Sequence, residues 1–467
     1  MKIALVLAPW YRRESPSPEL VMAASVLRKE GHQVTVYDIN NAIFNDSFLL
    51  RKYWKYFLLD APEEARNDFF SEAGGILSQY AEKILSGNPE AVIFKITGKT
   101  FPNSERLAKL IKEKDQGKLI IFSGALVSNQ EDVDSFVNGQ DSLPADYLIC
   151  GEDEVALPEL VKCLSSKSSL TLKRRGKIID CMMGPIQENL DLLPFYDFSD
   201  YDLNTYKFPD RLEMFISRGC PWHCAFCIDW LTEKKYRSMS GKRIAEELQF
   251  QARKYRIKHF RFCDKTINGD IAAMEEFCDS MLGIYKDNFP VMEWSGDAMI
   301  RPEMTRDLIF KMYTAGCRGL GYGLESGSDK VLKDIGKKFS SALAGEVVRN
   351  THEAGIFTSI NIMVGFPTET SVDFEQTLDF IDKNKSFIDE IRLTFIGCRI
   401  YKQSILHNQP DKFNLADVDT DFWATRDGVN TYDERVKRYE FICQHILDLG
   451  ISLRVNSRTT KKVVKAA

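Results

Sequence analysis

A short apolar strand pattern runs directly into three closely spaced cysteines in the stretch Met214-Phe-Ile-Ser-Arg-Gly-Cys-Pro-Trp-His-Cys-Ala-Phe-Cys227. The thiols of Cys220, Cys224 and Cys227 follow the spacing C-x3-C-x2-C. A [4Fe-4S] cluster has four irons, so three cysteine ligands leave one iron free to bind a small molecule. The stretch therefore predicts an α/β catalytic domain with an iron-sulfur site in the loop after its first strand.

A structural zinc site is the alternative interpretation of these cysteines, with His223 as a fourth ligand. Structural zinc is tetrahedral and is usually held by two separated pairs of ligands. The chain has no second C-x2-C pair, and His223 directly precedes Cys224. The spacing favours a cluster and leaves zinc as the rival.

The cysteine motif, with the aromatic Phe226 before the third thiol, resembles the signature of the radical S-adenosylmethionine (SAM) enzymes. The resemblance implies that Cys220, Cys224 and Cys227 hold a catalytic [4Fe-4S] cluster whose open iron binds SAM. In that superfamily the reduced cluster, fed by a donor such as flavodoxin or ferredoxin, splits SAM to a 5′-deoxyadenosyl radical that abstracts hydrogen from the substrate. The cofactor carries the chemistry and the protein directs it.

Strand and helix patterns alternate through the residues that follow. The expected strands are Met214 to Ser217, His259 to Cys263, Met292 to Ser295, Gly319 to Gly323, Thr358 to Met363 and Glu390 to Thr394. Six such units predict a partial (β/α)6 TIM-type barrel over residues 211–400, with its active site at the carboxyl ends of the strands.

The resemblance assigns SAM contacts to residues that follow these strands: Phe226, Asp264, Arg301, Glu325, Ser326, Gly365 and Glu369. Asp264 would accept from the methionine ammonium, and Arg301 would clamp a carboxylate. Glu325 and Ser326 would reach polar groups of SAM, and Gly365 and Glu369 would border the adenine. Plain turn and helix-capping roles remain open for the acids. Lys265 stands where the superfamily usually has an acid.

The first 165 residues show a second strand-helix alternation. Strands are expected at Ile3 to Ala8, Val34 to Asp38, Ala91 to Ile96, Leu119 to Phe122 and Tyr147 to Cys150, with helices near 19–30, 103–114 and 153–164. This rhythm predicts a doubly wound, Rossmann-like parallel sheet that binds its ligand at the carboxyl ends of the strands.

Small and polar residues follow those strands, namely Thr97, Ser123, Gly124, Gly151 and Glu152. With Gly31 to Asp38 they resemble the cobalamin (B12)-binding domain that precedes many radical SAM cores. The resemblance implies that these five residues contact cobalamin. The motif Asp-x-His-x-x-Gly, which supplies a cobalt-ligating histidine, is absent, and His32 lies in a helix-to-strand turn. Cobalamin is therefore expected without a protein histidine on cobalt.

Three other segments complete the predicted organisation. Residues 43–87 carry aromatic side chains at helical spacing, which predicts a helical insertion packed on the first domain. A role in capping a cavity is the alternative. Residues 166–210 form a proline-punctuated linker with a hairpin near Leu170 to Met183, and residues 401–467 form a small C-terminal α/β extension.

Composition narrows the possible functions further. The chain has 467 residues, 28% charged and 44% hydrophobic, and a net charge of -5, which disfavours a nucleic-acid binder. Its eleven cysteines follow no secreted disulfide pattern. We expect no signal peptide, because the apolar run Met1 to Ala8 is short and is followed at once by Pro9, and we expect no membrane span, because no apolar run is long enough. We expect an enzyme of the reducing cytoplasm that acts on a small molecule.

The sequence thus gives a ranked set of functions. The first is a cobalamin-dependent radical SAM enzyme that transfers a methyl group from methylcobalamin to an unactivated carbon or phosphorus. The second keeps the radical chemistry without methylation, as a rearrangement, ring contraction, cyclisation or oxidation. The third is a zinc-stabilised binding protein.

Overall fold

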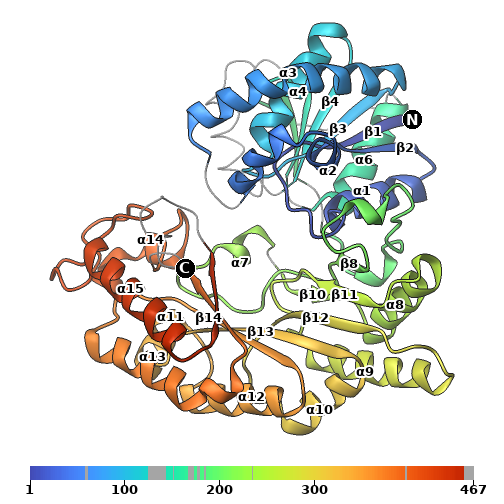
Figure 1. Cartoon of the computed structure of the whole chain (residues 1–467). Helices are drawn as coiled ribbons and strands as arrows, with labels where there is room; N and C mark the ends of the chain where they lie inside the picture. The colour runs from blue at the N-terminus through green and yellow to red at the C-terminus, as the bar shows by residue number, and fades with distance from the viewer. Residues whose placement is uncertain are drawn as a thin grey trace. The chain divides into compact units, whose positions relative to one another are not determined.

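The chain forms two compact units, Met1–Glu213 and Met214–Ala467 (Figure 1). This computed structural model describes residues 1–57, 61–124, 143–150, 152–166, 173–175, 179–183, 186–233, 235–394 and 397–456. Each unit contains one large sheet, and the two are described separately.

The first unit is built on a seven-stranded sheet. Its strands are β1 (Lys2–Leu7), β2 (Gln33–Asp38), β3 (Ala91–Lys95), β4 (Leu119–Ser123), β5 (Tyr147–Cys150), β6 (Lys173–Arg175) and β7 (Ile179–Met183). Their order is β2-β1-β3-β4-β5-β7-β6, with every pairing parallel except that of β6 with β7. The predicted doubly wound sheet is confirmed, and its topological switch point lies between β1 and β3.

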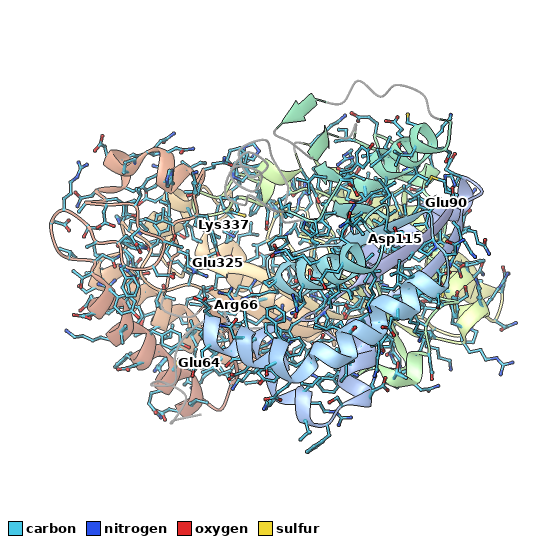
Figure 2. All side chains as sticks on the ribbon, turned by 90° about the horizontal axis from the view of Figure 1, so that it is seen from above. Glu64, Arg66, Glu90, Asp115, Glu325 and Lys337 are labelled. Atoms are coloured by element: carbon cyan, nitrogen blue, oxygen red, sulfur yellow. The ribbon has the colours of Figure 1, made fainter. Side chains whose placement is uncertain are left out.

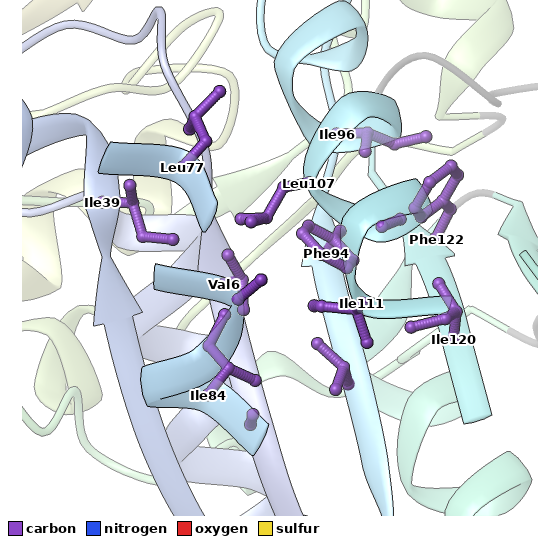
Figure 3. Packing of buried hydrophobic residues seen from close by; sticks show 14 of the residues in the cluster. Val6, Ile39, Leu77, Ile84, Phe94, Ile96, Leu107, Ile111, Ile120 and Phe122 are labelled. Atoms are coloured by element: carbon purple, nitrogen blue, oxygen red, sulfur yellow. The ribbon is translucent and has the colours of Figure 1, made fainter. Parts of the chain in front are cut away.

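Helices cover both faces of this sheet. They are α1 (Pro18–Lys29), α2 (Ile39–Asp46), the 3-10 helix η1 (Leu49–Phe57), α3 (Glu63–Ser86), α4 (Phe101–Lys114) and α6 (Asp153–Ser166). Helices α1 and α6 bury apolar side chains on one face. Helices α2, α3 and α4 cover the other, where Leu77, Leu107 and Phe94 belong to a continuous core (Figure 3). Burial on both faces is why the strands read as unbroken apolar runs.

The aromatic segment between β2 and β3 is helical and forms part of this core. Trp10, which follows β1, lies with its ring centroid 5.0 Å from that of Phe69 on α3. Tyr53 on η1 lies 5.3 Å from Phe69 in an edge-to-face arrangement. The insertion therefore extends the apolar core over the carboxyl end of β1.

The first unit extends past the expected boundary at residue 165. Strands β6 and β7 form the expected hairpin, but β7 pairs with β5 and so continues the sheet. The chain up to Tyr206, with the 3-10 helices η2 (Leu190–Leu192) and η3 (Leu203–Thr205), also bonds to this unit. Arg28 pairs with Asp200 at 2.7 Å, and the Tyr206 hydroxyl donates to Asp38 at 2.6 Å.

The second unit contains a seven-stranded sheet with the character of an open barrel wall. Its strands are β8 (Arg211–Met214), β11 (His259–Phe262), β12 (Glu293–Ala298), β13 (Cys317–Glu325), β14 (Phe357–Ile362), β15 (Glu390–Thr394) and β16 (Ser452–Asn456). The order is β16-β15-β14-β13-β12-β11-β8. The predicted barrel is confirmed with one strand more than expected, because α15 (Tyr432–Asp448) returns the chain to pair β16 in parallel with β15.

The first barrel strand ends earlier than predicted. After Met214 the chain leaves β8 and forms a short antiparallel ribbon of β9 (Ser217–Arg218) with β10 (Arg237–Ser238). The backbone N–H groups of Ile216 and Ser217 donate to the Asp264 carboxylate, at 3.1 and 2.5 Å. The Asp264 carboxylate thus accepts the backbone hydrogen bonds that a neighbouring strand would otherwise accept at this point.

Helices surround the second sheet, and most begin at a capping side chain. They are α7 (Asp229–Thr232), α8 (Gly241–Tyr255), α9 (Ile271–Lys286), α10 (Arg306–Thr314), α11 (Asp329–Ile335), α12 (Ser341–Glu353), α13 (Ser371–Asn384), η4 (Lys385–Phe387), α14 (Ile405–Asn408), η5 (Pro410–Phe413) and α15. Thr370, for example, forms a capping box with Asp373 on α13. Within the described part of the chain, no helix is both long enough and apolar enough to cross a membrane.

Candidate active site

The loop that carries the three cysteines is held at its centre by main-chain hydrogen bonds. The N–H of Ala225 donates to Ile335 O at the end of α11, and Ala225 O accepts from Leu406 N on α14, at 2.8 and 3.0 Å. The loop also belongs to an apolar cluster that includes Trp423 of the C-terminal segment. Residues after 400 therefore form one wall of the cysteine loop.

The thiols lie partly or fully out of solvent. Cys224 is buried, and Cys220 and Cys227 are half-buried. Burial raises the pKa of all three, that of Cys227 to about 12, with the Asp229 carboxylate adding to the rise. The thiols are thus protonated at neutral pH without a metal, and binding a cluster would release protons.

The arrangement fits an iron-sulfur cluster better than zinc. In the described ranges, no group of three His, Cys, Asp or Glu side chains is close enough to bind one metal ion. A four-iron cluster is wider than one ion, so its cysteines stand farther apart than the ligands of zinc. The His223 ring packs against Trp230, with a distance of 4.7 Å between the ring centroids.

A buried ion pair lies beside the thiols. Lys337 Nζ is 3.4 Å from Glu325 Oε1 and donates to Gly323 O at 2.7 Å. Figure 2 shows the two side chains next to each other within the second unit. Burial opposes the charge of Lys337, but Glu325 and the thiols of Cys224 and Cys220 raise its pKa. One positive and one negative group therefore adjoin the cysteine loop.

Sequence reasoning selected Glu325 and missed Lys337. Glu325 ends β13 with φ of +73°, a left-handed conformation that is costly for a residue with a side chain. Lys337 follows the glycine that ends α11, a position where lysine is usually exposed. Its side chain is instead only 6% exposed, which the local pattern does not signal.

Lys265 forms a second ion pair near the loop. Its Nζ lies 3.0 Å from Asp229 Oδ1. The backbone N–H of Asp229 donates to Cys227 Sγ at 3.4 Å. The lysine that replaces the usual acid therefore pairs with an acid of the cysteine loop.

Asp264 is buried, and its carboxylate accepts several donors. Besides the two N–H groups described above, the Ser217 hydroxyl donates to it at 2.5 Å. Burial raises its pKa to about 6, against the lowering effect of the Ser217 and Ile216 hydrogen bonds. In this structure Asp264 fixes the chain that enters the cysteine loop.

Two other predicted SAM residues have protein partners here. Arg301 is bidentate to Glu303, at 3.0 and 2.9 Å, and donates to Asn268 O at 2.9 Å. Ser326 lies 3.1 Å from the Thr377 hydroxyl and is 1% exposed. Both side chains thus stabilise the loops at the ends of β12 and β13.

The predicted adenine residues are held by α15. Glu369 is buried, accepts from Gly365 N at 3.0 Å and pairs with Arg438 at 2.8 Å. A Cβ at Gly365 would lie 2.4 Å from Cγ of Arg435, whose guanidinium stacks on Trp423. The C-terminal helix therefore shapes this turn. Phe226 is half-buried beside the apolar cluster of the cysteine loop.

The predicted cobalamin residues lie at the carboxyl ends of neighbouring strands in the first unit. Thr97 follows β3, Ser123 ends β4, and Gly124 has φ of +135°. A Cβ on Gly124 would lie 2.4 Å from Ile96 O, so only glycine fits between the two strand ends. Glu152 accepts from Gln187 N at 3.3 Å, and Gly151 lies outside the described residues.

Among the residues that the structure describes, several buried polar atoms without a hydrogen-bond partner lie at this same edge of the sheet. They are Trp10 Nε1 after β1, Asn40 Nδ2 after β2, both amide atoms of Asn103 after β3, and Ser123 Oγ at the end of β4. A buried polar group without a partner costs about 1–3 kcal/mol. Their concentration indicates a place where a polar ligand or ordered water completes the hydrogen bonding. His32 lies directly before β2, at the amino end of that strand and therefore away from these atoms. Its ring is hydrogen-bonded to the N-terminal amino group of the chain.

Comparison with known proteins agrees with this description. Residues 214–381 match the model of the Radical SAM superfamily. A relative from Pyrococcus horikoshii, the uncharacterized methyltransferase PH0819, is 25% identical over 345 residues, 71% of this chain and 72% of the relative.

Two solved structures share the fold over both units. One is the radical SAM methyltransferase TsrM from Kitasatospora setae, with a TM-score of 0.66 at 14% identity, over 94% of this chain and 83% of TsrM. The other is the cobalamin-dependent SAM radical enzyme OxsB, with a TM-score of 0.64 at 16% identity, over 95% of this chain and 56% of OxsB. At these identities the likeness establishes the fold alone.

Proposed function

We propose that this chain, an enzyme with a radical SAM domain over residues 214–381, is a cobalamin-dependent methyltransferase that acts on a small molecule. Cys220, Cys224 and Cys227 would hold a [4Fe-4S] cluster. When bound, the cluster would supply the electron that cleaves SAM to a 5′-deoxyadenosyl radical, and cobalamin would supply the methyl group.

The observation that carries this proposal is the pair of opposite charges beside the cysteine loop. SAM has a zwitterionic methionine end, with one carboxylate and one ammonium. Lys337 can donate to the SAM carboxylate, and Glu325 can accept from the SAM ammonium. One ion pair of the protein can therefore bind both charged groups of the methionine moiety. Their separation of 3.4 Å is long for an N–H···O bond, which leaves each group able to take a closer partner.

The remaining residues of the site act by positioning. Asp264 fixes the chain at Ile216 and Ser217, and the Ala225 hydrogen bonds fix the loop between the thiols. Arg438 and Glu369 hold the turn at Gly365. The apolar cluster around Trp423 excludes water from the loop on that side.

Cobalamin binding by the first unit is supported by the polar atoms at the ends of β1 to β4. A corrin ring carries many amide side chains, which would satisfy the Asn103 amide and the Ser123 hydroxyl. Gly124 lets the ends of β3 and β4 approach each other closely, because a Cβ there would clash with Ile96 O. The name of the relative from P. horikoshii favours methyl transfer as the outcome.

The cellular setting in the proposal is a reducing cytoplasm with a flavodoxin- or ferredoxin-type electron donor. None of the nine cysteines whose side chains the structure describes forms a disulfide bond, which is compatible with such a compartment.

The test is metal analysis with a UV-visible spectrum on protein purified without oxygen from cells supplied with cobalamin. About four irons and one cobalt per chain are expected for one [4Fe-4S] cluster and one cobalamin. Dithionite and SAM should then give 5′-deoxyadenosine, and Cys224→Ala should lose both iron and this product. Retained SAM cleavage in Cys224→Ala would contradict the proposal.

Other results would select the rival functions. Iron and SAM cleavage without cobalt would favour radical chemistry that does not use methylcobalamin. One tightly bound zinc and no iron would identify a zinc-stabilised protein.

A further inference from the structure

Lys265 connects to the cysteine loop through one ion pair and one hydrogen bond. Its Nζ is 3.0 Å from Asp229 Oδ1, and the N–H of Asp229 reaches Cys227 Sγ at 3.4 Å. The side chains of Lys265 and Asp229 are 50% and 38% exposed. The pair therefore adjoins a cluster ligand and stands partly in solvent.

The two charges act on the thiol in opposite directions. The Asp229 carboxylate places a negative charge beside Cys227, and Lys265 places a positive charge beside that carboxylate. The reduction potential of an iron-sulfur cluster depends on nearby charge, on hydrogen bonds to sulfur and on solvent exposure. A carboxylate beside the cluster opposes the added electron, and an ammonium beside that carboxylate offsets the opposition.

We infer that Lys265 is a positioning residue that raises the reduction potential of the cluster by neutralising Asp229 beside Cys227. The inference rests on the proposed function, because it requires a cluster on the three cysteines. The step concerned is the transfer of one electron from an external one-electron reductant to the oxidised cluster. No bond is made or broken, and Lys265 keeps its proton throughout.

The other lysine near the thiols can be separated from this effect. Lys337 is bonded to Glu325 and Gly323 O, and its proposed partner is the SAM carboxylate. Lys265 has its own acid on α7. Without SAM, the contribution of Lys265 to the potential can therefore be measured on its own.

The experiment is a redox titration of the full-length, cluster-loaded protein without SAM, followed by the EPR signal of the reduced cluster. Lys265→Met should shift the midpoint potential to a lower value, and Lys265→Arg should stay close to wild type. Asp229→Asn keeps the N–H to Cys227 and removes the charge, so it should shift the potential upward. The midpoint potential of the double variant Lys265→Met/Asp229→Asn should lie between those of the two single variants.

Lys311→Met is a matched control. Lys311 pairs with Asp279 at 2.6 Å, in a pair that joins α10 to α9 away from the cysteine loop. Its loss should leave the potential unchanged.

Two results would overturn the inference. One is an unchanged midpoint in Lys265→Met that carries a full complement of iron. The other is a midpoint potential of Asp229→Asn that is unchanged or lower than that of wild type. This second result would overturn the inference even if Lys265→Met fails to bind a cluster. A wild-type protein that holds no cluster would instead contradict the proposed function.

Discussion

Lys337 shows how one residue acquires a role that its sequence position does not signal. A lysine directly after a helix-ending glycine is normally a solvated cation. Here it turns inward, because Gly323 O and the Glu325 carboxylate provide hydrogen-bond partners. Burying a lysine is costly unless it is paired in this way.

Lys337→Met should raise the KM for SAM by about tenfold or more, since a charged hydrogen bond is worth about 1.5–3 kcal/mol. The measurement is 5′-deoxyadenosine formation against SAM concentration. Iron content should be unchanged. Lys338→Met, at the adjacent exposed lysine, should match wild type. An unchanged KM in Lys337→Met would remove this residue from the SAM site.

Asp264 should give the stability of the protein a defined pH dependence. Its pKa is raised from 3.8 to about 6 on folding, so the native state binds the proton more tightly. The resulting stabilisation is complete below pH 3.8 and is lost as the pH rises through 6. A shift of about two units corresponds to about 3 kcal/mol.

Asp264→Asn should lack this dependence. The free energy of unfolding, measured in urea on the apoprotein from pH 4 to 7, should fall more steeply for wild type than for the variant. Parallel pH profiles would show that Asp264 does not titrate in this window.

At the scale of elements, helix α15 is the support of the turn after β14. It supplies Arg438 to Glu369, and Arg435 to the carbonyls of Asp421 and Trp423, at 2.9 and 3.0 Å. Burial lowers the pKa of Arg435 to about 10, which still leaves it charged at neutral pH. The helix also returns the chain to form β16, so two features of the second unit depend on it.

Arg438→Met should destabilise the second unit by about 1–3 kcal/mol, because the buried Glu369 carboxyl loses its charged hydrogen-bond partner and, with its pKa already raised to about 7 by burial, takes up a proton. The double variant Arg438→Met/Glu369→Gln should recover a large part of this loss. Urea midpoints of the three proteins measure the effect. Equal losses in the single and double variants would show that packing, rather than charge, explains it.

A substitution at Gly124 tests whether the carboxyl ends of β3 and β4 need to approach each other closely. Gly124→Ala would place a Cβ 2.4 Å from Ile96 O at a φ of +135°. Strain of this kind costs about 1–3 kcal/mol, and the clash adds to it. The thermal midpoint and the cobalt content should both fall. Gly98→Ala, where no atom lies within 4 Å of the new Cβ, is the control and should leave both unchanged.

At the scale of the whole molecule, the chain divides into two units with separate cores and separate sheets. The unsatisfied polar atoms at strand ends lie in the first unit, and the cysteine loop with its ion pairs lies in the second. Each unit therefore offers a site for its own proposed cofactor.

Residues 1–208, expressed alone, should fold and bind cobalamin at about one per chain, because a unit with its own core can fold independently. Residues 209–467, which keep β8 with its sheet, should bind iron after reconstitution. Cobalamin binding is measured by visible absorbance after gel filtration. Asn103→Leu in the first segment should weaken it without lowering stability, since it removes an unsatisfied amide. Folded segment 1–208 without cobalamin affinity would contradict the proposed cobalamin site.

The sequence alone determined the two sheets and the position of the cysteine loop. Both depend on local regularities: apolar strands separated by amphipathic helices, and three thiols within eight residues. It also singled out Glu325, which lies beside the cysteine loop in the folded chain.

The tertiary structure decided which polar residues have partners. Arg301, Ser326 and Glu369 have motif positions suited to SAM, but Glu303, Thr377 and Arg438 bond to them. The roles of Lys337, Arg435 and Asn103, and the pairing of β16 with β15, were not predictable, because each depends on contacts between segments far apart in the chain. Local pattern fixes secondary structure, whereas burial and pairing of charge depend on long-range packing.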